Sequence, residues 1–268
     1  MAIQSPLREL HTQRTRTNAL LLLSLVAMVV FALPVNKSAI AATSHSAVPA
    51  DAGTALRPYV AQYNTTTRGM ELTLTRILKP GADGSFTLTN GGKIMVVGFH
   101  EVSVFKVEGA RIQPKSYVHQ ETGLINRRRE VHFTPGTDTI RSLYKEQWYD
   151  LPRTDMTLDR LSQQEQLRLT LLNDPTPAGD ISIQVADGKR VKDYQLLYVG
   201  EEILETALGP IRTLHFERLH DNPERKSDMW LAPDWDYLMV KTLHIEDNSP
   251  VEITLTSASI DGVAVEAQ

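Results

Sequence analysis

Residues 251–256 read VEITLT, so valine, isoleucine and leucine alternate with glutamate and threonine. This period of two puts the apolar side chains on one face of a strand and the polar ones on the other, which is typical of an antiparallel sheet with one buried face. The same period recurs over 71–77, 85–90, 194–198 and 214–217. These patterns predict a mainly β protein.

The alternation slips in two segments. In 72–77 the apolar position moves by one residue before Ile77, and in 102–107 it moves by one residue before Phe105. A β-bulge or a bend shifts the phase of a strand in this way. Turn residues separate the runs, for example KPGADG at 79–84, and such short turns predict hairpins and meanders. We expect roughly 11–14 short strands.

One segment departs from the period of two. Residues 161–165 read LSQQE, which has the form of a capping box. In that motif Ser162 accepts from the N3 amide, and Glu165 reaches back to the Ser162 amide. Leucines follow, and NDP at 173–175 ends the pattern. We predict a helix of about 10–12 residues here.

The predicted helix divides the chain into two strand sets, 59–150 and 180–260, and no internal repeat relates them. Two sets that share one helix favour a single β-rich domain over 58–262. We expect an antiparallel curved sheet, a barrel or a sandwich, with one short central helix.

The first 41 residues have the pattern of a secretory signal peptide. Three arginines precede residue 17, an apolar run fills 19–35, and AIA at 39–41 suits cleavage after Ala41. Residues 42–57, rich in Ala, Ser and Thr, are expected to form a flexible linker. We therefore expect a periplasmic protein with no stable membrane span after cleavage. An uncleaved anchor is the alternative, because a run of about 17 apolar residues is at the lower limit for crossing a bilayer.

Composition excludes several classes of function. The chain has no cysteine, which rules out disulfides, thiol nucleophiles, cysteine metal sites and a lipoprotein anchor. Its 28 basic and 32 acidic residues give a net charge of −4. Without the four basic residues and one acidic residue of the leader, 24 and 31 remain, a net charge of −7. We expect no nucleic-acid partner for a domain of this charge.

Aromatic residues gather near position 230. Trp230, Trp235 and Tyr237, with Pro233 between them, can line a groove for an apolar chain or a glycan, or can anchor the core where a strand turns. We favour the core role for Trp230. Asp234 is expected to cap the turn after Pro233 through its side chain.

Arg218 completes the candidate binding residues, which are Trp230, Asp234, Tyr237 and Arg218. We expect Arg218 and Arg225 to pair with Asp228 or Asp234. No catalytic or metal-binding residue is predicted, and no cofactor is expected. Neither a nucleophile elbow nor an HExxH motif occurs in the sequence.

Two other polar patterns have a simpler interpretation. His215 and Glu217 share one face of a predicted strand, and His244 and Glu246 repeat the spacing, but a solvated polar face explains both pairs. Arg127-Arg128-Arg129 is the densest charge run and can meet the phosphate or carboxylate groups of the envelope. We interpret it as a solvated loop before a strand at 130–133.

Several short elements share a pattern with a known family. They are YVAQY at 59–63, ALGPIRT at 207–213, MWLAPD at 229–234 and YLMV at 237–240. Together they resemble the bacterial domain-of-unknown-function family numbered 3108, over about residues 57–257. WLAPD is the most specific element, and Met239 stands where the family usually has proline. The resemblance implies an exported, β-rich protein of the Gram-negative envelope, and it implies no activity.

Three functions fit these observations. The first is non-enzymatic binding of an apolar or amphipathic ligand, such as a lipid, or of an envelope protein, in the concavity of a curved sheet. The second is a structural or assembly role in which strand edges pair with partners. The third is hydrolysis of envelope polymers by scattered carboxylates or histidines, which requires such groups to converge with perturbed pKa values.

Overall fold

The structure is a computed structural model, and it describes residues 56–67, 69–94, 97–123, 126–175 and 179–267. The predicted signal peptide and nearly all of the predicted linker lie outside the described residues. Leu56 and Arg57 are the two linker residues that the structure describes. Leu56 is 2% exposed, and Arg57 Nε lies 2.6 Å from Asp236 Oδ2. These two residues of the predicted linker are therefore part of the folded body.

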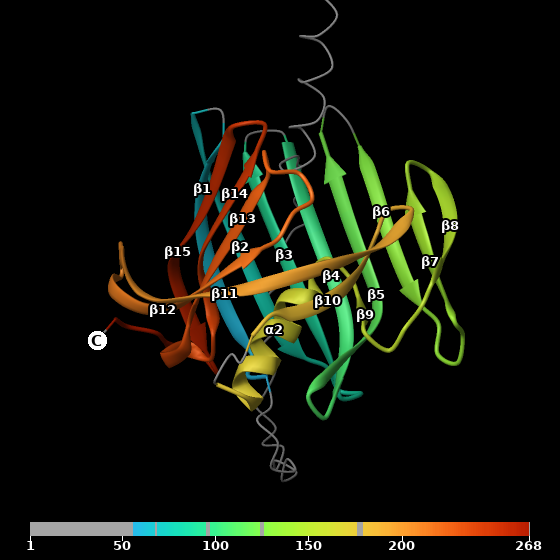
Figure 1. The fold of residues 1–268 in the computed structure, drawn as a ribbon, viewed down its shortest axis with the longest axis horizontal. Coiled ribbons are helices and arrows are strands. Elements are labelled where there is room, and N and C mark those ends of the chain that lie inside the picture. Colours follow the sequence, from blue (N-terminus) through green and yellow to red (C-terminus); the bar gives the residue numbers. More distant parts are fainter. Residues whose placement is uncertain (1–55, 68, 95–96, 124–125, 176–178, 268) are drawn as a thin grey trace, which may run out of the picture.

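The described residues form a 16-stranded sheet that curves around a single helix (Figure 1). The first half contains β1 (Tyr59–Thr67), β2 (Met70–Pro80), β3 (Ser85–Ile94), β4 (Val97–Glu108), β5 (Arg111–Thr122), β6 (Arg127–Phe133), β7 (Thr139–Tyr144) and β8 (Gln147–Pro152). The second half contains β9 (Thr157–Leu158), α2 (Ser162–Asn173), β10 (Ile181–Asp187), β11 (Arg190–Thr206), β12 (Gly209–Arg218), β13 (Lys226–Ala232), the 3-10 helix η2 (Pro233–Trp235), β14 (Leu238–Glu246), β15 (Ser249–Ile260) and β16 (Val263–Ala264).

The strand order shows why the sheet is continuous. Each half is a meander, and β1 joins them by pairing with both β2 and β15. All pairs are antiparallel except the short pair of β9 with β10. Strands β8 and β9 end the order without pairing to each other, so the sheet is not closed. The predicted antiparallel curved sheet with one central helix is thus confirmed, and the barrel and sandwich alternatives are not.

The phase of two strands differs from the prediction. In β2 the inward positions continue through Arg76, which is 6% exposed, so the alternation does not slip before Ile77. In β4 the inward residue is Ser103, which is fully buried, whereas Val104 is only partly buried. A register shift does occur at Val104/Phe105, but the extra residue lies on β5. The interior thus accepts polar side chains that a hydrophobic pattern assigns to solvent.

The start of α2 is capped differently from the prediction. The helix spans the predicted 12 residues, but Ser162 makes no cap hydrogen bond to the backbone of the first turn. Instead Asp159 Oδ1 accepts from the backbone N–H groups of Leu161 (2.8 Å) and Ser162 (2.9 Å). Glu165 does not reach back to Ser162, because its Oε1 accepts from the Tyr59 hydroxyl at 2.6 Å. The capping-box prediction was therefore wrong.

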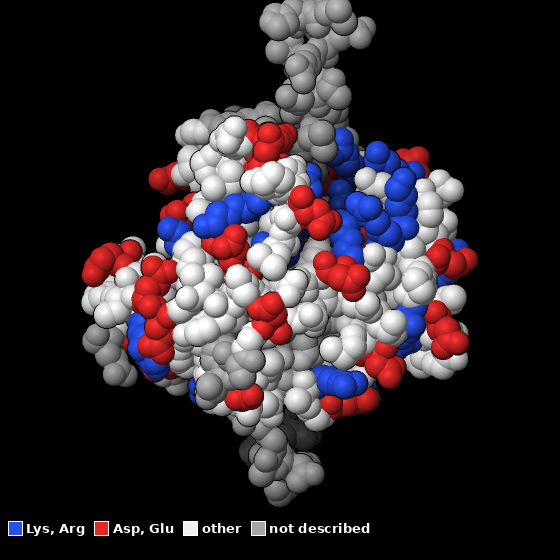
Figure 2. Space-filling model, in the orientation of Figure 1, with Lys and Arg blue, Asp and Glu red and all other residues white. Residues whose placement is uncertain are grey.

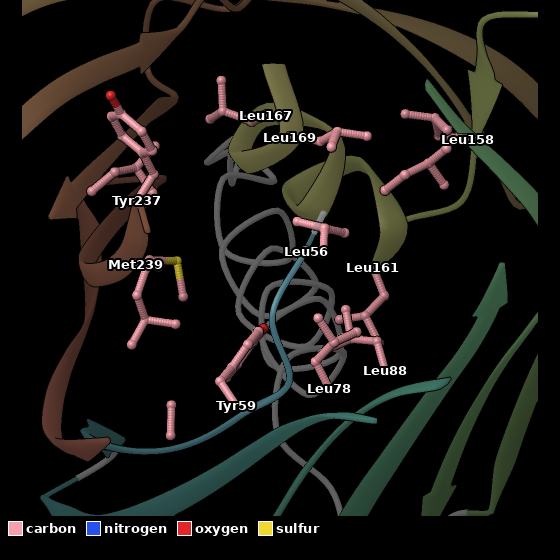
Figure 3. Close-up of a cluster of buried hydrophobic side chains, with 14 of the residues drawn as sticks. Leu56, Tyr59, Leu78, Leu88, Leu158, Leu161, Leu167, Leu169, Tyr237 and Met239 are labelled. Atoms are coloured by element: carbon pink, nitrogen blue, oxygen red, sulfur yellow. The ribbon is translucent and has the colours of Figure 1, made fainter. Parts of the chain in front are cut away.

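Helix α2 fills the concave side of the sheet. Figure 3 shows Leu167 and Leu169 of α2 in one buried cluster with Tyr59, Tyr237 and Met239. The cavity between α2 and the Tyr59, Tyr63 and Met239 side chains is about 10 Å³, roughly what one water molecule needs. The interior on this side of α2 is therefore packed and leaves no room for a ligand. Within the described residues, no helix is long and apolar enough to cross a membrane.

Candidate functional site

The structure does not bring the four candidate binding residues together. Trp230 is 8% exposed, but it stacks on the His215 ring with centroids 4.5 Å apart, and its indole N–H donates to Glu202. Its neighbours Met229 and Leu231 face α2, so Trp230 lies on the outer face. Trp230 is thus buried under polar side chains rather than in the main core.

The other three candidates lie apart from Trp230. Tyr237 is 8% exposed and belongs to the core cluster beside α2. Asp234 is on η2 and pairs with Arg212 at 2.8 Å, and no Asx cap is formed there. Arg218, at the end of β12, lies with its guanidinium carbon 4.3 Å from the centre of the Tyr194 ring. These residues do not form a common site.

The expected ion pairs of Arg218 and Arg225 are also wrong. Asp228 accepts from His215 Nε2 at 2.9 Å and lies 3.3 Å from Lys226, while Arg225 pairs with Glu246. Among the described residues, no group of three or more His, Asp and Glu side chains is arranged to hold a metal ion.

An open pocket lies between α2, the start of β5, β9 and the start of β10. Its volume is about 310 Å³, which is within the range of ligand pockets. The apolar lining residues are Ile112, Met156, Leu158, Ile181 and Ile183, and the polar ones are Arg111, Asp155, Gln166, Thr170, Asp180 and Ser182. We refer to it as the apolar pocket. Met156 is 48% exposed and therefore lies at its rim.

Local structure explains why this pocket stays open. Strand β9 is two residues long and pairs with Gln184 and Val185 of β10, so Ile181 and Ile183 extend beyond it. On the opposite wall, Gln166 ties α2 to the turn before β5. Its Oε1 accepts from the Ile112 N–H at 2.7 Å, and its Nε2 donates to a backbone carbonyl. The β9–β10 pairing and the Gln166 hydrogen bonds thus hold the two walls of the pocket in place.

The arginine triplet at 127–129 is part of β6, so the loop interpretation was wrong. Arg127 and Arg129 point to the concave face and Arg128 to the outer face, where it pairs with Glu130. Figure 2 shows Lys and Arg side chains gathered beside β11, where the upper ends of β5 and β6 lie in Figure 1. This end of the interior is polar, in contrast to the end with the apolar pocket.

Carboxylates and a histidine also converge at the polar end. Glu101 Oε1 accepts from the Tyr117 hydroxyl at 2.6 Å and lies 3.3 Å from His119 Nδ1, and Asn90 donates to its Oε2 at 2.9 Å. Burial alone would raise the pKa of Glu101, but His119 and Tyr117 hold it well below its usual value. Burial alone would lower the pKa of His119, but Glu101 and Glu121 raise it. These groups therefore form a satisfied ion pair, which favours a structural role over proton transfer.

Comparison with known proteins identifies the family. A family model described as "Protein of unknown function (DUF3108)" matches residues 85–256. The chain belongs to the DUF3108 family. The resemblance inferred from the sequence is thereby confirmed, and the matched part of this DUF3108 protein includes α2 and the walls of the apolar pocket.

Comparisons with curated proteins and with solved structures give two further results. No curated protein matches this DUF3108 chain. A crystal structure of a β-barrel-like protein of the DUF1849 family from Brucella abortus is similar to it, with 8% sequence identity and a TM-score of 0.49. That similarity covers 76% of this chain and 98% of the other.

Proposed function

We propose that this protein is exported to the periplasm of a Gram-negative cell and there binds the apolar chain of an amphipathic molecule in the apolar pocket, without catalysing a reaction. The pocket of about 310 Å³ is the observation that carries the proposal. It is walled by five apolar side chains, whereas the cavity on the Tyr59 side of α2 is only about 10 Å³. The basic and apolar pattern of residues 1–41 supports export.

The pocket suits a chain better than a compact polar ligand. Its wall on β10 presents Ile181 and Ile183, and Leu158 and Ile112 face them. Each methylene that leaves water contributes about 0.8 kcal/mol. Lengthening a bound alkyl chain by two methylenes should therefore strengthen binding by up to about 15-fold until the pocket is full.

Calorimetric titration with hexanol, octanol and decanol tests the binding. These alcohols carry no charge, so they report on the apolar pocket alone. We expect affinity to rise with chain length and then to level off. Ile181→Trp should fill the pocket and remove this dependence, whereas the control Val199→Trp, at a site 52% exposed, should leave it intact. Affinity that does not depend on chain length in the unaltered protein would refute the proposal.

Cell fractionation tests export separately. We expect the protein in the periplasmic fraction, with a mass that lacks the first 41 residues. Recovery of the full-length chain from the cytosol would show that the export proposal is wrong, whatever the result of the alcohol titrations.

One observation supports assembly through strand edges as a second candidate. Strand β8 ends the strand order, and its Trp148 is 43% exposed. An edge strand with an exposed aromatic side chain can pair with a strand of another protein. A photo-crosslinking amino acid in place of Trp148 should then capture an envelope protein in cells, and a crosslinker in place of Val199 should not.

A further inference from the structure

Five cationic side chains converge at the polar end of the sheet interior. They are Arg127 and Arg129 on β6, Arg160 between β9 and α2, Lys192 on β11, and Arg218 at the end of β12, close enough to Arg160 for that charge to lower its pKa. We refer to them as the basic cluster. The first four have side chains that are 34%, 20%, 37% and 33% exposed, so they are partly buried but still within reach of a solute.

The carboxylates at this end do not balance these charges. Asp187 serves three of the cations, with Arg160 at 3.5 Å, Arg129 at 3.9 Å and Lys192 in hydrogen-bond contact. Glu121 lies 3.7 Å from Arg127. Glu101 is the third carboxylate, and it is paired with a histidine. Within the described residues, Asp187 and Glu121 are thus the carboxylates in salt bridges with these five cations, so positive charge is in excess.

Arg218 is the cation with the least compensation. No carboxylate of the described residues forms a salt bridge with it. Its guanidinium instead covers the Tyr194 ring at 4.3 Å, and its Nε donates to His220 Nε2 at 3.3 Å. Burial lowers the pKa of Arg218, and the positive charges of Arg160 and Arg225 lower it further. The surroundings of Arg218 therefore favour an added negative charge.

Two histidines lie beside Arg218 and are joined by a serine. The Ser227 hydroxyl is 2.9 Å from His220 Nε2 and 2.8 Å from His244 Nδ1. Burial and the charge of Arg218 lower the pKa of both rings, that of His220 to about 4. Both are consequently neutral at neutral pH.

The other charged groups around these rings are few. Arg225 faces both histidines and lowers their pKa, and Glu246, 3.6 Å from His244 Nε2, raises it. An anion bound against Arg218 would offset the positive field and favour protonation of the rings.

We propose that the basic cluster binds a phosphoryl group and that His220 and His244 take up protons when it binds. A phosphate monoester carries a charge of about −1.5 to −2 near neutral pH, which offsets much of this excess of positive charge. Guanidinium groups bind phosphate oxygens through paired N–H donors. A carboxylate brings a single charge and offsets less of the excess. This site is separate from the apolar pocket and does not rest on the function proposed for it.

Calorimetric titration with glycerol 1-phosphate and with acetate tests the ligand class. We expect the phosphate to bind at least tenfold more tightly than acetate, and Arg218→Gln to weaken its binding at least tenfold. Arg212→Gln is the control on the same strand, since Arg212 is 47% exposed and paired with Asp234. Equal affinities of the two variants would overturn the proposal. Arg218→Lys keeps the charge and should retain part of the affinity, which tests the site if Arg218→Gln does not fold.

Sulfate provides the test of proton uptake, because it remains a dianion between pH 6 and 8. We expect the affinity for sulfate to rise as the pH falls over this range, by up to tenfold per pH unit for each proton taken up. The double variant His220→Gln/His244→Gln should lose this dependence. A pH dependence that is unchanged in the double variant would refute the role of the histidines.

Vesicles separate the sources of the phosphoryl group. Neutral phosphatidylcholine vesicles with and without 20% phosphatidic acid present the same monoester on a lipid. Binding only to the vesicles with phosphatidic acid identifies a lipid headgroup, and binding only to glycerol 1-phosphate identifies a small solute. Failure to bind either would overturn the proposal. Ile181→Trp should leave phosphate binding unchanged, so this result is independent of the apolar pocket.

Discussion

Replacing Arg168 with methionine should destabilise the protein far more than the same replacement of Arg212. Arg168 Nη1 lies 2.6 Å from Glu165 Oε2, and the two side chains are 3% and 1% exposed. Arg212 Nη2 lies 2.8 Å from Asp234 Oδ1, but these side chains are 47% and 55% exposed. The distances are nearly equal, so burial is the variable that separates the two ion pairs.

The magnitude follows from what remains after each substitution. Loss of Arg168 leaves the Glu165 carboxylate buried in the packed space beside α2, with the Tyr59 hydroxyl as its remaining hydrogen-bond donor. Removing one partner of a buried pair costs about 3–5 kcal/mol. Loss of Arg212 leaves Asp234 in water, and exposed pairs contribute about 0.2–1 kcal/mol. We expect the two variants to differ by at least about 2 kcal/mol in the free energy of unfolding.

A third variant distinguishes charge from packing. Glu165→Met/Arg168→Met removes both charges, and apolar replacement of a buried pair is often neutral. The double variant should thus be more stable than Arg168→Met alone. Urea unfolding followed by circular dichroism gives the free energies for all three proteins. The reasoning fails if Arg168→Met costs no more than Arg212→Met, or if the double variant is the least stable.

Three further predictions concern the sheet. Gly92→Ala should lower the free energy of unfolding by about 1–3 kcal/mol, because its Cβ would lie 2.8 Å from the Thr73 backbone oxygen; an unchanged urea midpoint would contradict this. Leu56→Ala should cost about 2–5 kcal/mol, since Leu56 is 2% exposed, and a melting temperature equal to that of the unaltered protein would place Leu56 outside the fold. In the folded state His119 lowers the pKa of Glu101, although burial alone would raise it. The ionised Glu101 therefore stabilises the fold above the unfolded pKa of about 4.3, and this stabilisation is lost as the pH falls below that value. Glu101→Gln should reduce this loss in urea midpoints measured between pH 5 and 3, and curves that stay parallel would count against it.

The sequence predicted the fold class because most strands keep one apolar face. The alternation at 251–256 corresponds to β15, and the break at 161–165 corresponds to the start of α2. The errors occur where the interior is polar. Arg76 lies inward because Gln164 of α2 accepts from it, and Ser103 because its hydroxyl donates to Asp159 at 2.7 Å. These partners are far away in the sequence, so the pattern of one strand cannot reveal them.

The sequence predicted the basic cluster only in part, because Arg218 was a candidate binding residue but the arginine triplet was interpreted as a solvated loop, and it did not predict the apolar pocket. The triplet at 127–129 has no apolar alternation, so it resembled a loop, and only its position in β6 brings Arg129 near Asp187. The apolar pocket depends on where β9 stops along β10, and a strand of two residues has no recognisable period. A search for arginines at alternate positions before a predicted strand would have found the first site, but no sequence signal identifies the second.

The packed core between the two ends of the sheet interior separates the apolar pocket from the basic cluster. Strand β10 runs from the apolar pocket at Ile181 to Asp187, which pairs with three members of the basic cluster. Six residues of strand span about 20 Å at about 3.3 Å per residue. Val185, which lies between the two sites on the same face of β10, is fully buried in the core, so the two sites are separated along that face. Independent binding of an apolar chain at one end and a phosphoryl group at the other follows more directly from this arrangement than binding of one molecule to both.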